Sequence, residues 1–202
     1  MSFAYSPVDL TAAAAGGGAG RITVGASGAT YTSVEDALAA GANVFSIITD
    51  LTEEQLITVP DDGLEISIEN GTFNIGTGYI NVAGNQLRLD GNGTLAYGSV
   101  NGTLISGVAG ATLMVEGLTI DNNSAITTCL TNIDYARWSN VIFLGNVRIC
   151  GNQNIYEGSI YRSSAIVIPT GISNTLIDGS IFDSVVVQNS GTNTVISDAV
   201  VY

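Results

Sequence analysis

Acidic residues recur at one position of a repeated phrase, and they are the strongest candidates for chemistry in this sequence. Glu69, Asp90, Glu116 and Asp178 each stand directly before Gly or Asn-Gly, and Leu144 takes the place of the acid in a further copy. If Asp90 and Glu116 lie one coil of a repeat apart, their backbones are about 5 Å apart, which overlaps the carboxyl separation of a retaining glycosidase. The alternative, which we favour, is an exposed acidic corner, because turns favour Asp and Glu for their solvation alone.

The phrase around these acids predicts a strand, a sharp corner and a second strand. Apolar and polar residues alternate on both sides of the corner, which puts one face of each strand into a core, and Gly or Asn supplies the positive φ that a corner requires. Five copies of the phrase occur, at Ile66–Ile75, Leu87–Tyr97, Leu113–Ile120, Val141–Ile149 and Thr175–Phe182.

The spacing of the copies argues for a solenoid rather than for isolated hairpins. Their corner residues are Asn70, Gly91, Gly117, Gly145 and Gly179, which gives steps of 21, 26, 28 and 34 residues. A repeat of roughly 20 to 30 residues that cannot bury its own apolar face indicates a solenoid. Since nothing between the copies has helical periodicity, we expect the solenoid to be all β.

Stacked coils of this kind form a parallel β-helix, in which each coil pairs with the coils above and below it. The chain resembles the right-handed, pectin-lyase-like β-helix family, which includes polysaccharide lyases, polygalacturonases and many phage and viral tailspike or fibre proteins. The resemblance covers about residues 30 to 197 and rests on the form of the repeat. We therefore expect an all-β, right-handed parallel β-helix over residues 30–202, preceded by an Ala/Gly-rich arm over residues 1–29.

A short helix is expected ahead of the first coil. Ser33 fits an N-cap with the acidic Asp36 three residues later, and apolar residues then recur at helical spacing from Val34 until Gly41. The family that the chain resembles typically begins in this way. Such a helix seals the first coil and prevents its open edge from recruiting other strands.

The resemblance also implies which residues an enzyme of this fold would use. Polysaccharide lyases use Ca²⁺ held by acids and an Arg as base, which makes Arg88 and Arg148 candidates, although a salt-bridge role suits both better. Polygalacturonases carry clustered Asp residues, a Gly-His-Gly and an Arg-Ile-Lys. This chain has neither His nor Lys, and Arg148-Ile-Cys150 matches that last motif only in part. We therefore favour a protein without enzymatic activity, cofactor or metal ion.

Aromatic residues in the longer stretches between copies form another candidate binding surface. They are Tyr135, Trp138, Tyr156 and Tyr161. Aromatic residues in the loops of a solenoid can line a sugar groove, and they serve subunit interfaces equally well. Of the two, we favour the interface.

Composition argues against several functions. The chain carries 18 acidic residues against 5 Arg, a formal net charge of −13 that would repel nucleic acids and anionic membranes. No apolar run reaches the roughly 18 residues needed to span a bilayer, and no basic segment begins a secretory signal. Cys129 and Cys150 are 21 residues apart, about one coil, so they can stack near each other. We expect both to be buried small apolar residues, with their redox state left open.

These observations lead to the hypothesis of a non-enzymatic structural protein located in a virus particle, as part of its surface, spike or fibre. We expect a homo-oligomer, specifically a trimer, in contact with other virion proteins. The arm at residues 1–29 and an uncovered apolar end at Val200–Tyr202 are the expected assembly contacts. Two alternatives remain: a glycan-cleaving tailspike-type hydrolase or lyase acting through Asp90 and Glu116, and an adhesin that binds a glycan without cleaving it.

Overall fold

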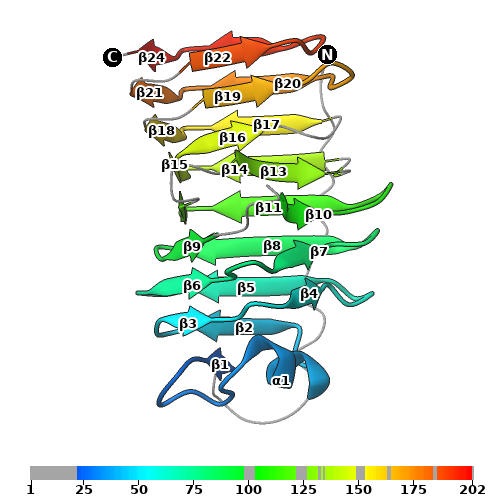
Figure 1. Cartoon of the computed structure of the whole chain (residues 1–202), viewed down its shortest axis with the longest axis vertical. Helices are drawn as coiled ribbons and strands as arrows, with labels where there is room; N and C mark the ends of the chain where they lie inside the picture. Colours follow the sequence, from blue (N-terminus) through cyan, green and yellow to red (C-terminus); the bar gives the residue numbers. More distant parts are fainter. Residues whose placement is uncertain are drawn as a thin grey trace.

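The computed structural model describes residues 22–97, 103–121, 127–131, 133, 135–148, 153–162, 165–183 and 186–201. In these residues the chain forms a right-handed parallel β-helix with one short helix at its N-terminal end (Figure 1). Three parallel sheets run along the axis, and each coil contributes one strand to each sheet in turn. The smallest sheet has seven strands, so the described residues hold about seven complete coils. The predicted all-β solenoid is confirmed.

We name the three sheets A, B and C. Sheet A contains β1 (Thr23–Val24), β2 (Val44–Ile47), β5 (Leu64–Ile68), β8 (Gln86–Gly91), β11 (Thr112–Glu116), β14 (Tyr135–Ser139), β17 (Asn154–Glu157), β20 (Thr175–Asp178) and β23 (Val195–Ser197). Sheet B contains β3 (Leu51–Thr52), β6 (Thr72–Asn74), β9 (Thr94–Ala96), β12 (Thr119–Asp121), β15 (Ile142–Leu144), β18 (Ile160–Arg162), β21 (Ile181–Asp183) and β24 (Val200–Val201). Sheet C contains β4 (Leu56–Thr58), β7 (Tyr79–Asn81), β10 (Thr103–Ser106), β13 (Thr127–Thr131), β16 (Asn146–Arg148), β19 (Ala165–Ile168) and β22 (Val186–Asn189).

Residues with positive φ turn the chain from sheet A into sheet B, as the sequence predicts. The corner residues have φ values between 49° and 122°, and they are Asn70, Gly91, Gly117, Asn140, Gly158, Gly179 and Asp198. Gly adopts this region without steric cost, and Asn tolerates it better than most residues. At Gly91 a side chain would also collide with the neighbouring coil, because an added Cβ would lie 2.2 Å from the carbonyl oxygen of Ile68.

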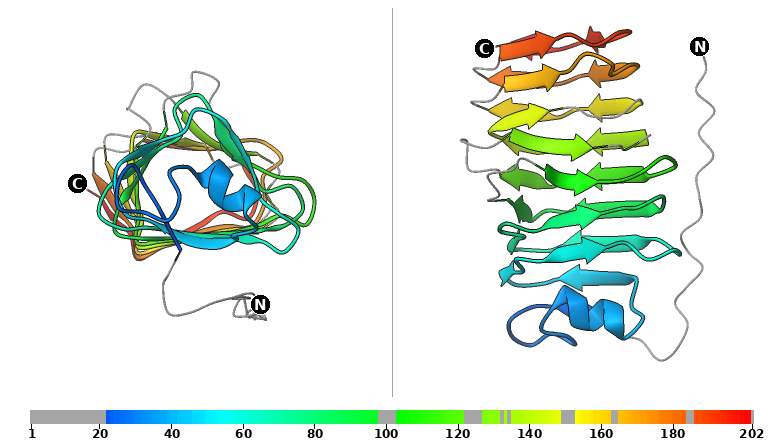
Figure 2. Two further views of the ribbon diagram at one scale, coloured as in Figure 1. Left: turned by 90° about the horizontal axis from the view of Figure 1, so that it is seen from below. Right: turned by 45° about the vertical axis from the view of Figure 1, so that its right-hand side comes forward.

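The predicted helix is present and closes the N-terminal end of the solenoid. Helix α1 (Val34–Ala39) begins at the N-cap Ser33, whose Oγ accepts a hydrogen bond of 3.0 Å from the backbone N–H of Asp36. Val34 and Ala37 are buried against the first coil, and α1 lies across its opening when the molecule is seen along the axis (Figure 2). Strand β1 precedes the helix and pairs with β2, so residues 23–24 already belong to sheet A. Residues 1–21 of the expected arm lie outside the described residues.

A buried carboxylate ties α1 to the first coil. Glu53 follows β3, and its Oε1 accepts a hydrogen bond from the backbone N–H of Val34 at the start of the helix. Burial raises the pKa of Glu53, and the negative charges of Glu35 and Asp36 raise it further, while the hydrogen bond from Val34 acts in the opposite direction. Glu53 is therefore a group whose protonation changes between the folded and unfolded chain.

Glu53→Gln is expected to stabilise the protein more at neutral pH than at acid pH. Because the pKa of Glu53 is raised on folding, its contribution to stability is fully present below the unfolded pKa and is lost as the pH rises through the folded pKa. The amide keeps an acceptor for the Val34 N–H without the charge. Urea unfolding at several pH values measures the free-energy difference between variant and wild type, which should grow with pH. The same trend in the exposed neighbour, Glu54→Gln, would contradict this explanation.

The inward-facing positions of sheet A correct the predicted alignment of the copies. Aligning the five copies of the repeated phrase predicts that Ile68, Leu89, Val115, Phe143 and Ile177 are equivalent and face inward, and all five are buried. Leu89, Val115 and Ile177 do belong to one column of register partners, which also contains Phe45, Ile66, Trp138, Tyr156 and Ile196. However, Ile68 is level with Gly91, and Phe143 lies in sheet B, level with Ile120. The predicted fourth copy is therefore wrong, because it joins a strand of sheet B to a strand of sheet C.

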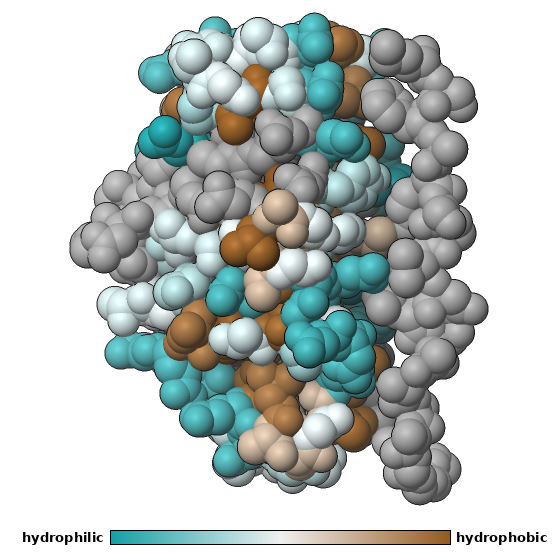
Figure 3. Space-filling model, turned by 90° about the vertical axis from the view of Figure 1, so that its right-hand side faces the viewer, coloured by the Kyte–Doolittle hydropathy of each residue, from teal (hydrophilic) through white to brown (hydrophobic). Residues whose placement is uncertain are grey.

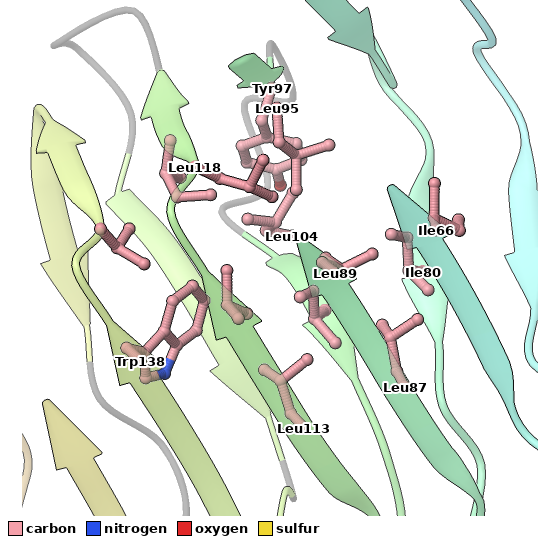
Figure 4. Packing of buried hydrophobic residues seen from close by; sticks show 14 of the residues in the cluster. Ile66, Ile80, Leu87, Leu89, Leu95, Tyr97, Leu104, Leu113, Leu118 and Trp138 are labelled. Atoms are coloured by element: carbon pink, nitrogen blue, oxygen red, sulfur yellow. The ribbon is translucent and has the colours of Figure 1, made fainter. Parts of the chain in front are cut away.

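Aromatic rings fill the interior of the coils in the C-terminal half. Trp138 and Tyr156 stack with ring centroids 5.9 Å apart and an interplanar angle of 3°. A second stack joins Phe143 to Tyr161 at 4.9 Å and Tyr161 to Phe182 at 5.3 Å. Figure 4 shows Trp138 pointing into the same interior as leucine and isoleucine side chains from other coils. Such stacks add specific packing to the burial of apolar area.

The rung formed by β22, β23 and β24, which we call the open rung, leaves its interior uncovered. Val187, Ile196 and Val201 are its inward-facing residues, one from each sheet, and their register partners in the preceding coil are buried. In the open rung they are 37%, 42% and 71% exposed. The two ends of the described solenoid therefore differ, since α1 covers one and nothing described covers the other.

No helix among the described residues is long and apolar enough to cross a membrane.

Candidate functional site

The predicted acidic pair lies on the outer face of sheet A, in two adjacent coils. Asp90 in β8 and Glu116 in β11 are register partners, which confirms that they are one coil apart. Arg88, also in β8, contacts both carboxylates: its Nε is 3.2 Å from Oδ2 of Asp90, and its terminal nitrogen is 3.9 Å from Oε2 of Glu116. The side chains of Asp90 and Glu116 are 21% and 61% exposed. One guanidinium therefore stands between the two candidate catalytic groups.

The other members predicted for this acidic position need correction. Glu69 lies two residues past the level of the pair, where Ser67 is the register partner of Asp90. Leu144 lies in β15 of sheet B, level with Asp121. Of the predicted acids outside the pair, only Asp178 shares the column, through its pairing in β20.

Between Glu116 and Asp178, two members of this column escaped the sequence analysis. Ser139 is the register partner of Glu116, and Glu157 is the register partner of both Ser139 and Asp178. Glu157 precedes Gly158 and so carries the acid–Gly signal, but it lies inside the predicted 34-residue step between Gly145 and Gly179. Ser139 precedes Asn140 and offers neither an acid nor a Gly. The column thus reads Thr23, Ser46, Ser67, Asp90, Glu116, Ser139, Glu157, Asp178 and Ser197.

The acids further along the column are also bonded across coils. Nε and a terminal nitrogen of Arg137 lie 3.1 and 2.7 Å from Oε2 of Glu157. The Oγ of Ser139 donates to the same oxygen at 3.4 Å, and Oγ of Ser197 donates to Oδ1 of Asp178 at 2.5 Å. Each of these contacts joins one coil to the next. We name the column with its arginines the sheet A polar ladder.

This geometry suits a structural ladder better than an acid and a nucleophile. A retaining glycosidase needs two carboxyl groups on either side of a sugar, one of which holds a proton. Here Asp90 and Glu116 stand side by side on the outside of a sheet, and Arg88 contacts both. Exposed ion pairs of this kind contribute about 0 to 1 kcal/mol each. Their effect is therefore to help hold neighbouring coils in register.

The second candidate arginine lies on another sheet. Arg148 is exposed in β16 of sheet C, where it is level with Cys129 in β13 and Val167 in β19. The structure therefore does not bring Arg148 together with the acidic pair of sheet A. Cys150, the expected neighbour of Cys129, lies outside the described residues.

Three of the four candidate aromatic residues are core residues, which corrects their assignment to loops. Trp138, Tyr156 and Tyr161 are at most 1% exposed and face the interior from β14, β17 and β18. Tyr135, at the start of β14, is partly exposed. A sugar groove or subunit interface that needs Trp138, Tyr156 and Tyr161 at the surface is therefore ruled out by their burial.

No group of three or more His, Cys, Asp or Glu residues in the described ranges is arranged to hold a metal ion. No protein-family model matches the chain, and neither the curated proteins nor the solved structures contain a significant match. The described residues themselves show a parallel β-solenoid.

Proposed function

We propose that this chain is a non-enzymatic structural protein of a virus particle, which assembles with copies of itself into the surface, spike or fibre of that particle. The proposal of a viral role rests on the resemblance of the repeats to tailspike and fibre proteins. The observation that carries the proposal of assembly is the open rung. Exposed apolar side chains grouped at one place, as in this rung, favour contact with another surface.

The open rung favours contact with a second copy for two physical reasons. Val187, Ile196 and Val201 would be removed from water by such a contact, which is favourable. Asp198 is the only charged residue between positions 186 and 201, whereas the whole chain carries a formal charge of −13. Copies that repel each other elsewhere can therefore approach at this rung.

The polar ladder supports a structural role over catalysis. Arg88 bridges the two candidate catalytic groups, and Arg137 bonds the next acid of the column. These contacts use the charged side chains to join coils. The alternative of a glycan-cleaving hydrolase or lyase requires the same carboxylates to act on a substrate instead.

Light scattering of the chain over a range of concentrations tests the proposal. We expect a homo-oligomer, and we expect Ile196→Asp with Val201→Asp to weaken self-association by roughly 10-fold or more, because contact would bury two new charges. Val108→Asp is a matched control, since Val108 is 55% exposed and lies outside the open rung. A wild-type chain that stays monomeric at every concentration would contradict the proposal.

A screen for glycan cleavage separates the structural role from the enzymatic alternative. We expect no cleavage by the wild type, and we expect Asp90→Asn with Glu116→Gln to assemble normally. Cleavage by the wild type that is lost in this double variant would instead establish the hydrolase or lyase alternative.

A further inference from the structure

One outward-facing column of sheet B changes from polar to apolar residues halfway along the solenoid. Its members in the N-terminal half are all threonine, and those in the C-terminal half are isoleucine or valine. Register pairing places them in one line: Thr72, Thr94, Thr119, Ile142, Ile160, Ile181 and Val200. We name the last four the sheet B apolar stripe. Their strands, β15, β18, β21 and β24, lie one above another at the left of Figure 1.

The fold alone does not account for this change. Thr, Ile and Val are all β-branched and all favour strands. A polar or an apolar residue of this type therefore suits the strand conformation at these positions. The interior is filled by the intervening residues, such as Phe143, Tyr161 and Phe182, which are buried. The isoleucines point to the other face of the sheet, where they are partly exposed, and Val200 is 47% exposed. Replacing threonine by isoleucine there gains stability only if something covers the face.

The spacing of the apolar stripe favours a second copy of this chain as its cover. The four residues recur once per coil, about 4.8 Å apart. An identical stripe has the same spacing, so the side chains of two copies can interdigitate along its full length, as they do between paired sheets of a steric zipper. An unrelated globular surface offers no such periodic match.

Charge also favours a second copy. The apolar stripe itself is uncharged, and the next outward column carries Leu144, Arg162 and Asp183, in which the two charges are opposite. Two acidic chains therefore meet there without a surplus of negative charge. On sheet A the corresponding apolar column is shorter, namely Ile155, Leu176 and Val195, and it runs beside Glu157 and Asp178. On the right-hand side of the molecule, hydrophobic and hydrophilic residues are interspersed (Figure 3).

We propose that the sheet B apolar stripe is the surface through which two copies of this chain pack side by side. This inference rests on the proposed function and names the lateral surface of the assembly, in addition to the contact at the open rung.

The test uses the substitution that the chain itself makes in its N-terminal half. In the full chain, Ile160→Thr with Ile181→Thr keeps a β-branched residue at both positions and leaves the core untouched. We expect circular dichroism to be unchanged and the dissociation constant of the assembly, measured by analytical ultracentrifugation, to rise by roughly 100-fold, because both partners lose apolar contacts at the centre of the interface. Ile155→Thr with Leu176→Thr is the matched control, in the same coils but on sheet A, and it should leave the dissociation constant unchanged.

The outcomes separate this inference from the proposed function. If the wild type assembles and the sheet B variant assembles equally well, the apolar stripe is not the lateral surface, while the proposed function stands. If the sheet A control dissociates instead, the inference is again overturned. A wild type that is monomeric at every concentration overturns both. Should the sheet B variant lose its circular dichroism signal, Ile142→Thr alone, at the end of the stripe away from the open rung, is the variant that must weaken assembly.

Discussion

Replacing Phe143 with alanine is expected to lower the free energy of unfolding by roughly 3 to 5 kcal/mol, the cost of removing a large buried aromatic side chain. Phe143 is 1% exposed and stacks on Tyr161 at 4.9 Å, and its ring also contacts Trp138 at 5.3 Å. The cavity would therefore open beside rings of two neighbouring strands, and large rigid rings cannot readily close it. Urea unfolding followed by circular dichroism measures the change.

Phe143→Leu is the matched comparison for this cavity. Leucine keeps most of the apolar volume, so we expect a loss well below that of alanine, about 1 to 2 kcal/mol. A loss below about 1 kcal/mol for alanine would mean that the aromatic interior can rearrange around the missing ring, contrary to the packing described above.

Gly91→Ala is expected to destabilise the corner between β8 and β9 by roughly 1 to 3 kcal/mol from its backbone conformation alone. The φ of Gly91 is 122°, a region that residues with a Cβ rarely adopt. In addition, the new Cβ would lie 2.2 Å from the carbonyl oxygen of Ile68, so one coil must move away from the next. Because the displaced atoms are backbone, we expect the total loss to exceed the dihedral cost. Thermal and urea unfolding measure it.

Two other glycines separate the causes of this loss. Gly28 has a positive φ of 72° but open space around its Cβ position, so Gly28→Ala reports the dihedral cost without a collision. Gly84 lacks a positive φ, and its Cβ would meet its nearest neighbour at 3.4 Å, so Gly84→Ala should be nearly neutral. Equal losses for Gly91→Ala and Gly28→Ala would show that the close approach of coils at Gly91 has no energetic weight.

The architecture could be predicted because its determinants are local. Alternation sets which side of each strand is buried, and Gly or Asn at a corner supplies the positive φ, as at Gly117 and Gly179. The cap of α1 is equally local, since Ser33 bonds the backbone N–H three residues later. These features predicted the parallel β-helix and its helix from one sequence.

The register of the coils could not be predicted in the same way, because different corners carry the same residue types. Gly145 has a φ of 101°, like the sheet A corners, but it turns the chain from sheet B into sheet C. The true corner of that coil is Asn140, which follows Ser139 and carries no acid. The alignment of the copies therefore took Gly145 as the corner of the fourth copy, with Leu144 in place of the acid, and this misplaced copy put Phe143 in the wrong column.

The candidate site was predicted only in part for a related reason. Asp90 and Glu116 share a column because their copies were aligned correctly. Their contact with Arg88 depends on side-chain positions across two coils, which no repeat pattern encodes. The burial of Trp138 likewise depends on which set of alternate residues in β14 faces the interior, and the register of the coils decides that.

The parallel pairing of every sheet strand with its equivalents in adjacent coils has a consequence for how the length of such a protein can change. Each coil enters and leaves the three sheets at the same places, so the gain or loss of one whole coil lets the strands on either side pair as before. Loss of a single strand would instead leave the strands above and below it in that sheet without their partner. The length of the solenoid therefore changes by whole coils, in steps of about 4.8 Å.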